Sequence, residues 1–175
     1  GPGGAAMGPR ARASTSPSPP LSPLPSAPLA PLRPVINADA LEQLTGQPVD
    51  AKSFAVRSAR DGEIFVGLDD QKRSLDSRMQ VVTCHDRPVA VAGVMGSLES
   101  GVTAGTRNIW LESALFAPPR VRQSARALGL RTDASSRFEK GLPVEMTLPC
   151  SARSLALLSQ EFSCSEIGRW GGGTG

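Results

Sequence analysis

The chain has 175 residues, 39% of them hydrophobic and 20% charged, which leaves room for one domain with a buried core. Its formal net charge is +3, but Arg10, Arg12 and Arg33 in the first 34 residues account for that excess, so the basic pI of about 9.1 does not indicate a nucleic-acid surface. No segment approaches the roughly 18 consecutive apolar residues that a membrane-spanning helix needs.

Residues 1–34 differ in composition from the rest of the chain. They contain ten of the sixteen prolines, no acidic residue and almost no large apolar side chain other than leucine. Such a segment cannot bury enough apolar surface to offset the entropy lost on ordering. We therefore expect a disordered tail that a protease would trim to a core starting near Val35, and a targeting role for this tail stays open.

The segment after the tail has the pattern of short strands. Asp39 to Leu44 predicts one short helical turn, ended by Gly46 and Pro48. Turn residues then separate five β-branched or alternating runs, and the connections are too short for parallel crossovers, so the runs predict antiparallel hairpins. The five runs are Phe54–Arg57, Glu63–Leu68, Met79–Cys84, Pro88–Gly93 and Asn108–Phe116.

The second half of the chain changes to helical periodicity. Pro118 and Pro119 are placed to open a helix, and Gly129 is placed to close it. Leu142–Phe162 predicts a second helix, with a break or a late start at Pro149. Strands followed by helices predict an α+β layered domain, with antiparallel strands packed against helices.

The residue types that often bind metals are few. Cys84, Cys150 and Cys164 are widely spaced with no CxxC pair, which predicts reduced thiols in a cytoplasmic protein and no metal site. His85 lies in the turn sequence THDRP, and we interpret it as a solvated turn residue, because no serine or cysteine motif nearby marks it as a catalytic base.

Glu112 is the most informative carboxylate. Alternation along the strand from Asn108 to Phe116 places it on the same face as Trp110 and Ala114, where a charge is costly unless it has a partner. One interpretation is a buried ion pair with an arginine of the next helix. The other is a carboxylate held to accept a hydrogen bond from a ligand.

Two further features allow two interpretations each. The GVMGS loop (Gly93–Ser97) is either a tight connection with positive φ or a place where the backbone approaches a substrate ester closely. Five arginines around the predicted helix form a basic stripe that is either simply solvated or a contact for tRNA phosphates. They are Arg120, Arg122, Arg126, Arg131 and Arg137.

Several blocks occur together in one order: GQPVDA (Gly46–Ala51), PVAVAGVMGS (Pro88–Ser97), NIWLESALF (Asn108–Phe116) and ARALGLRTDASSRFEKG (Ala125–Gly141). Through them the chain resembles the bacterial phenylalanyl-tRNA synthetase beta subunit, in its B3/B4 editing segment. The resemblance implies a B3/B4-like tRNA-editing domain over residues 35–166, followed by a Gly-rich truncated linker over residues 167–175.

The resemblance also implies roles for individual residues. In the family, the glutamate that matches Glu112 recognises the phenolic hydroxyl of tyrosine wrongly attached to tRNA(Phe), and Gly96, Thr132 and Ala134 fall in the wall of the same pocket. A site built to bond a hydroxyl can reject an analogue that lacks it by about 10⁴ to 10⁵.

This chain departs from the family pattern at two positions. Asp50 stands where the family often has a pocket histidine, so it is the candidate to orient the attacking water, in a different way from a histidine. Ser97 stands where a second glycine is usual, which would narrow the pocket slightly.

The enzyme of the family that the chain resembles joins phenylalanine to its tRNA with ATP and Mg²⁺. It is a tetramer of two alpha and two beta subunits in the cytoplasm. Aminoacylation belongs to the alpha subunit, so no cofactor is expected in this segment. The implied contribution is hydrolysis of mischarged tyrosyl-tRNA(Phe). The alternatives are a non-catalytic scaffold or tRNA-binding module of the synthetase, with editing lost, and a free-standing relative with another partner.

We predict that this chain alone does not activate phenylalanine, because its sequence contains no ATP-binding motif and no class II synthetase signature. Phenylalanine-dependent pyrophosphate exchange is expected to stay at background at every ATP concentration. Exchange above background from pure protein would show that the chain carries the activation chemistry itself.

Overall fold

The computed structural model describes residues 5–13, 35–162 and 164–168. Within them, the strands are β1 (Ala5–Ala13), β2 (Val35–Asn37), β3 (Phe54–Ser58), β4 (Ile64–Val66), β5 (Lys72–Ser74), β6 (Gln80–Cys84), β7 (Arg87–Val91), β8 (Met95–Gly96), β9 (Asn108–Ala114) and β10 (Cys164–Gly168). The α-helices are α1 (Ala38–Thr45), α2 (Pro118–Ala127), α3 (Asp133–Phe138) and α4 (Thr147–Glu161), and short 3-10 turns are η1 (Ala51–Ser53) and η2 (Val144–Met146).

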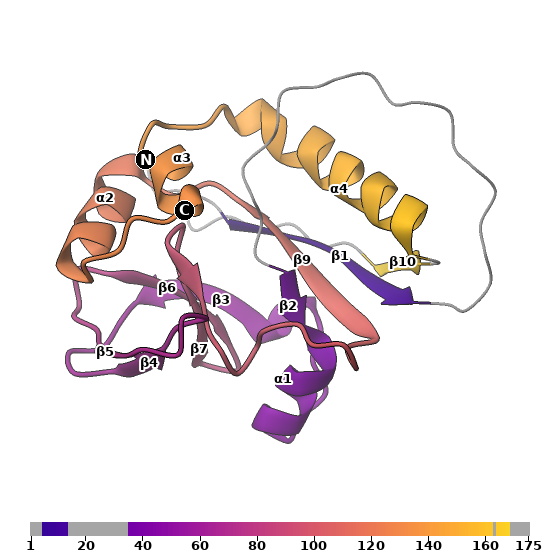
Figure 1. The fold of residues 1–175 in the computed structure, drawn as a ribbon, viewed down its shortest axis with the longest axis horizontal. Helices are drawn as coiled ribbons and strands as arrows, with labels where there is room; N and C mark the ends of the chain where they lie inside the picture. Colours follow the sequence, from indigo (N-terminus) through magenta and orange to yellow (C-terminus); the bar gives the residue numbers. More distant parts are fainter. Residues whose placement is uncertain (1–4, 14–34, 163, 169–175) are drawn as a thin grey trace.

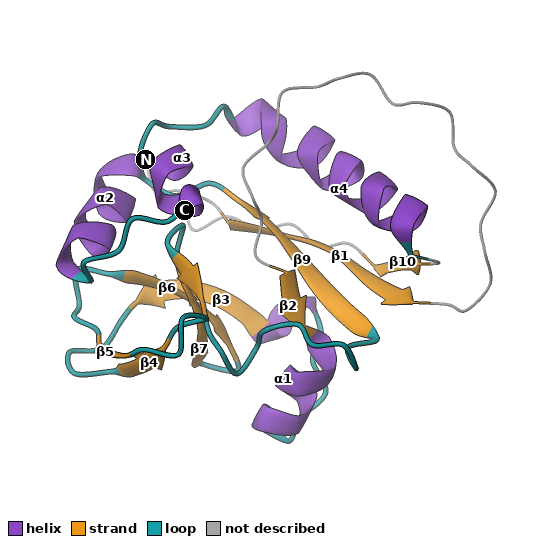
Figure 2. Ribbon diagram, in the orientation of Figure 1, coloured by secondary structure: helices purple, strands orange, loops and turns teal. Residues whose placement is uncertain are grey.

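The strands form antiparallel sheets (Figure 2). One sheet has the order β10-β1-β9-β2, a second has the order β3-β6-β7-β8, and β4 pairs with β5 in a separate hairpin. Figure 1 shows α4 along one side of β9 and β1, with the second sheet on the other side. The α+β prediction is therefore confirmed.

Strand β9 is buried because both of its faces are covered. On one face Trp110 packs edge-on against Phe54 of β3, with ring centroids 5.2 Å apart. On the other face the hydroxyl of Ser113 donates a 2.7 Å hydrogen bond to the carbonyl oxygen of Thr147 at the start of α4. The predicted alternation is confirmed, and burial of such aromatic side chains is a large part of the core energy.

The predicted elements agree closely with the observed ones. Each of the five predicted strand runs contains a strand, with bounds that differ by at most two residues. Helix α2 begins at Pro118 and ends in a Schellman motif, in which Gly129 has φ 64° and the N–H of Leu130 bonds the carbonyl oxygen of Ala125. The late start of the last helix is confirmed, because α4 begins at Thr147 with Pro149 in its first turn.

The N-terminal tail differs from our expectation over Ala5–Ala13, which forms β1 between β9 and β10. Pairing to a strand edge uses backbone groups, so it does not require large apolar side chains, of which this segment has only Met7. The register with β9 shifts between Met7 and Arg10, around Pro9, which has no N–H to donate. The rest of the predicted tail, residues 1–4 and 14–34, lies outside the described residues.

The C-terminal boundary also differs in part. Strand β10 reaches Gly168, so the first two residues of the expected linker belong to a strand. The remainder, residues 169–175, lies outside the described residues. None of the described helices is long and apolar enough to span a membrane.

We predict that the backbone amides of Ala5–Ala13 are protected in solution, because β1 pairs with strands on both of its sides. Hydrogen exchange of these amides should be at least about tenfold slower than in an unstructured chain, equivalent to about 1.4 kcal/mol of opening free energy. The amides of β6, in the middle of the second sheet, provide the protected reference. Exchange at the rate of an unstructured peptide would instead support a disordered tail.

Candidate functional site

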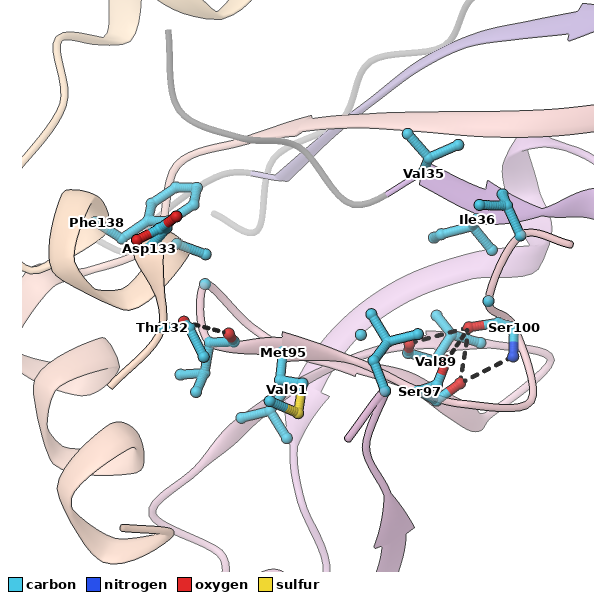
Figure 3. Close-up of a pocket in the computed structure, with 17 residues that line it drawn as sticks. Val35, Ile36, Val89, Val91, Met95, Ser97, Ser100, Thr132, Asp133 and Phe138 are labelled. Carbon is cyan, nitrogen blue, oxygen red and sulfur yellow. Dashed lines mark hydrogen bonds between the residues drawn. The ribbon is translucent and has the colours of Figure 1, made fainter. Parts of the chain in front are cut away.

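A pocket of about 430 Å³ lies between the two sheets and the start of α3 (Figure 3). Strand β2 contributes Val35 and Ile36 to its wall, and β7 contributes Val89 and Val91. Phe138 of α3 lies at the other end of the view from β2. The lining is mostly aliphatic, which suits a ligand with a large apolar part.

Three of the four residues that the family resemblance places in an editing pocket line this one: Gly96, Thr132 and Ala134. Gly96 belongs to β8, whereas Thr132 and Ala134 lie at the N-terminus of α3. The fold thus brings the GVMGS block and the RTDAS block to the same cavity, although β9 and α2 separate them in sequence.

Thr132 connects the start of α3 to the GVMGS loop (Gly93–Ser97). Its hydroxyl donates a 2.7 Å hydrogen bond to the carbonyl oxygen of Val94 and accepts one of 3.0 Å from the N–H of Ser135. The Ser135 side chain is within 3.0 Å of the N–H of Thr132, which completes a capping box. The hydroxyl of Thr132 is therefore engaged in holding the pocket together.

The two glycines of GVMGS have different roles, and the interpretation as a tight connection with positive φ holds at Gly93. Gly93 has φ 69°, a tight connection that favours glycine. Gly96 leaves room for Leu68, because a Cβ at this position would lie 3.3 Å from the Cδ1 of Leu68. Because Gly96 has no side chain, it contributes only backbone atoms to the pocket wall.

Backbone hydrogen bonds attach the β4–β5 hairpin to the GVMGS loop (Gly93–Ser97) and to Leu98, which follows that loop. The N–H of Leu68 bonds the carbonyl oxygen of Gly96 at 3.1 Å, and the N–H of Leu98 bonds the carbonyl oxygen of Val66 at 3.0 Å. Leu68 is 55% exposed and also lines the pocket. It therefore forms part of the pocket mouth.

Ser97, which stands where the family usually has glycine, lies in the pocket wall and is buried. Its hydroxyl is 2.7 Å from that of Ser100, whose oxygen is in turn 3.3 Å from the carbonyl oxygen of Val89. Both hydroxyls therefore have partners within the protein, and they add a polar patch to an otherwise aliphatic wall.

Glu112 is buried in β9 with 1% of its surface exposed, and it is not among the residues that line the pocket. It lies on the β9 face that carries Trp110, whose cross-strand partner Ile36 does line the pocket. Further along, Phe116 packs against Phe138, another lining residue, at a centroid distance of 5.4 Å. Glu112 is thus behind the pocket wall and does not line it. Its neighbours on the same face, Trp110 and Phe116, lie against the lining residues Ile36 and Phe138.

Asp50 lies outside the pocket lining and caps η1. Its Oδ1 accepts hydrogen bonds from the N–H groups of Lys52 at 2.8 Å and Ser53 at 3.0 Å. Desolvation raises the pKa of this carboxyl, but the hydrogen bonds from Lys52 and Ser53 outweigh it and hold the pKa below its ordinary value. The structure gives Asp50 a capping role, and its carboxylate is not among the groups that line the pocket.

The arginines of the basic stripe lie mainly at the surface. Arg120, Arg122 and Arg126 are exposed on α2, which has no acidic residue in its first turn. Arg122 donates a 3.1 Å hydrogen bond to the carbonyl oxygen of Glu139, which connects α2 to the end of α3. The stripe adjoins α3 but is not part of the pocket lining.

The cysteines and the histidine lie away from the pocket lining. All three cysteines are free, and burial raises the pKa of the Cys84 thiol to about 11, so this thiol is a poor nucleophile. His85 has φ 46° in its turn and lies 3.0 Å from the carbonyl oxygen of Pro48 through Nε2. Among the described residues, no group of three or more His, Cys, Asp or Glu side chains is placed to hold a metal ion.

The sequence model of one family, the B3/4 domain, matches residues 35–163, which include all the elements around the pocket. The chain belongs to the B3/4 domain family. Several curated relatives are named phenylalanine–tRNA ligase beta subunit. One from Synechococcus sp. strain CC9605 is 93% identical over 139 residues, covering 79% of this chain and 17% of the relative.

Other relatives with this name are less similar. The one from Synechococcus sp. strain CC9902 is 67% identical over 139 residues, or 79% of this chain and 17% of the relative. The one from Prochlorococcus marinus strain MIT 9313 is 58% identical over 132 residues, or 75% of this chain and 16% of the relative. This B3/4 domain chain therefore spans about 17% of the length of the relatives that it matches.

Sequence reasoning missed several pocket residues of this B3/4 domain. Val35 and Ile36 belong to a three-residue strand whose place depends on pairing with β9, which no local pattern shows. Leu68 and Asp133 are contiguous with predicted features, but neither was assigned to the pocket. The capping box at Thr132 was the available signal for α3, although its third helical residue is serine where glutamate or glutamine is usual.

We predict that Gly93→Ala destabilises this B3/4 domain by about 1 to 3 kcal/mol more than Gly46→Ala does. Both glycines have positive φ, 69° and 64°, so both substitutions impose similar backbone strain. At Gly93 the new Cβ would also lie 2.9 Å from the Cγ2 of Val121, whereas at Gly46 it would meet no atom within 4 Å. Urea unfolding of both variants measures the difference, and equal losses would contradict the packing argument.

Proposed function

We propose that this B3/4 domain is the editing part of a phenylalanine–tRNA ligase beta subunit, and that its pocket receives the tyrosyl ester of mischarged tRNA(Phe) for hydrolysis. The observation that supports this proposal best is the convergence of Gly96, Thr132 and Ala134 on one cavity. The names of the curated relatives support the assignment to the beta subunit.

The size and lining of the pocket suit a tyrosyl group. A volume of about 430 Å³ lies within the range of roughly 300 to 1,000 Å³ typical of small-molecule sites. The aliphatic wall of Val89, Val91 and Ile36 and the ring of Phe138 can cover an aromatic side chain. The ester and the attached nucleoside would then lie toward the mouth, beside Leu68.

In this proposal, Glu112 accepts a hydrogen bond from the phenolic hydroxyl. A buried carboxylate that bonds a substrate hydroxyl favours tyrosine over phenylalanine, which has no hydroxyl. Glu112 lies behind the wall, so the contact requires the pocket to extend to β9 when the ester is bound. The two aromatic contacts on this face, at Trp110 and Phe116, would keep the strand in place while the wall adjusts.

We propose that water attacks the ester directly. A serine or threonine nucleophile needs an adjacent base. The hydroxyl of Thr132 already donates to Val94, and no histidine or lysine is present among the described residues that line the pocket. The contribution of the domain would be to hold the ester and a water molecule in a reactive arrangement.

The partners of the proposed enzyme follow from the same assignment. An alpha subunit would complete a tetramer of two alpha and two beta subunits and carry out aminoacylation with ATP and Mg²⁺. Arg120, Arg122 and Arg126, exposed on α2, are proposed to contact tRNA phosphates. Such contacts would position the acceptor end without reading its sequence.

A second candidate is a non-catalytic scaffold or tRNA-binding module. The observation that favours it is Asp50, which caps η1 at the position where the family often has a pocket histidine. A domain that kept the fold and the pocket but lost a catalytic group would still bind the substrate.

We predict that Glu112→Gln slows hydrolysis of tyrosyl-tRNA(Phe) by about 30-fold, equivalent to about 2 kcal/mol, and changes hydrolysis of phenylalanyl-tRNA little. The physical reason is the loss of a charged acceptor for the phenolic hydroxyl. The measurement is deacylation by a full beta subunit that carries this segment, paired with an alpha subunit. Glu161→Gln, an exposed change on α4, is the matched control.

Other outcomes separate the candidates. An equal effect of Glu112→Gln on both esters would mean that Glu112 only supports the fold. If the unmodified segment does not deacylate either ester and Asp50→His restores the reaction, the domain binds substrate but has lost its chemistry. The second candidate would then replace the first.

A further inference from the structure

Asp133 is the one ionisable side chain among the described residues that line the pocket. It lies between Thr132 and Ala134, at the first position of α3, and Figure 3 draws it beside Phe138. The rest of the lining is aliphatic or aromatic apart from the hydroxyls of Ser97, Ser100 and Thr132. The charge of the pocket is therefore concentrated at its α3 end.

The carboxylate of Asp133 is available to a ligand. The residue is exposed, and no hydrogen bond or ion pair joins its side chain to another residue in the described part of the chain. Its backbone is nevertheless held in place, because the Thr132 hydroxyl on one side bonds Val94 and closes a capping box with Ser135. A fixed backbone with an uncommitted carboxylate is a favourable arrangement for binding.

An aminoacyl ester brings a positive charge into this pocket. Its α-amino group is protonated at mildly acidic pH, below the pKa of about 7.7 to 8 that a peptide α-amine has. An ammonium in an apolar cavity needs a hydrogen-bonded partner, preferably a charged one. The pocket hydroxyls have protein partners: those of Ser97 and Ser100 bond each other, and that of Thr132 bonds Val94. Among the lining side chains, Asp133 supplies the complementary charge.

We propose that Asp133 binds the α-ammonium group of the aminoacyl ester and thereby makes the pocket selective for esters with a free α-amine. This proposal rests on the proposed function, because it assumes that the pocket receives an aminoacyl ester. The contact with Asp133 would orient the substrate so that its ammonium lies at the N-terminus of α3. The aromatic ring then lies against the aliphatic wall of β2 and β7.

A different explanation for this residue is helix stabilisation. Acidic side chains in the first turn interact favourably with the exposed N–H groups there. In that case Asp133 would affect the stability of the six-residue helix α3, and the charge of a ligand would make no difference. The two explanations can be separated with a pair of ligands that differ only in this charge.

The experiment uses two amide-linked probes, which the domain cannot hydrolyse as esters. The first is L-tyrosine joined to 3′-amino-3′-deoxyadenosine, and the second carries 3-(4-hydroxyphenyl)lactate in place of tyrosine, so that a neutral hydroxyl replaces the ammonium. Calorimetry at about pH 6.5, where the α-amine is protonated, gives the dissociation constants for the full chain and its variants.

The expected result is a selective loss. Asp133→Asn should weaken binding of the tyrosyl probe by about tenfold and leave the lactyl probe unchanged, because the variant loses the charge and keeps the shape. Asp133→Glu, which keeps the charge, should retain part of the preference for the tyrosyl probe. Asp70→Asn, an exposed change outside the pocket lining, should affect neither probe.

Two results would overturn the proposal. Equal weakening of both probes in Asp133→Asn would assign the residue to the fold, and unchanged binding of both would show that the ammonium binds elsewhere. If Asp133→Asn does not fold, the comparison is made with Asp133→Ser, since serine is accepted at helix N-termini. Binding of neither probe to the unmodified chain would instead reject the proposed function, and this inference with it.

Discussion

The hydrogen bond from the hydroxyl of Thr132 to the carbonyl oxygen of Val94 joins two of the segments that line the pocket. It connects the start of α3 to the loop between β7 and β8, two parts of the chain that have no strand pairing with each other. A buried or half-buried hydrogen bond of this kind contributes only about 1 kcal/mol to folding. Its importance lies in geometry, since Ala134 and Asp133 follow Thr132 directly and take their positions from it.

The two carboxylates near the pocket, Glu112 and Asp133, differ in burial and therefore in the roles proposed for them. Glu112 is enclosed in β9 with 1% of its surface exposed, and Asp133 is exposed at the pocket lining. In the proposed function, a ligand would reach Asp133 without a change in the wall and Glu112 only after one, because Asp133 lines the pocket and Glu112 does not. Recognition of an amino acid would then proceed in two stages, first by its ammonium and afterwards by the end of its side chain.

Much of this arrangement could be predicted from sequence because it is local. Alternation placed Glu112 on the Trp110 face, and glycine and proline placed the ends of α2. Gly96, Thr132 and Ala134 came from resemblance, since composition alone does not bring two distant blocks together. The wall from Val35 and Ile36 could not be foreseen, because a three-residue strand takes its place only by pairing with β9. The strand at Ala5–Ala13 was missed for the same reason: its backbone pairs although its side chains predict no core.

Different contacts hold the mouth of the cavity and its α3 end. Leu68 is held by a backbone bond to Gly96 and forms part of the mouth, while the α3 end is held independently by Thr132. The turn residues Asp69 and Asp70, which follow Leu68, are not among the residues that line the pocket. Substitutions at Leu68 would thus act on the mouth of the cavity and substitutions at Thr132 on its α3 end, so the two ends of the cavity can vary independently of each other.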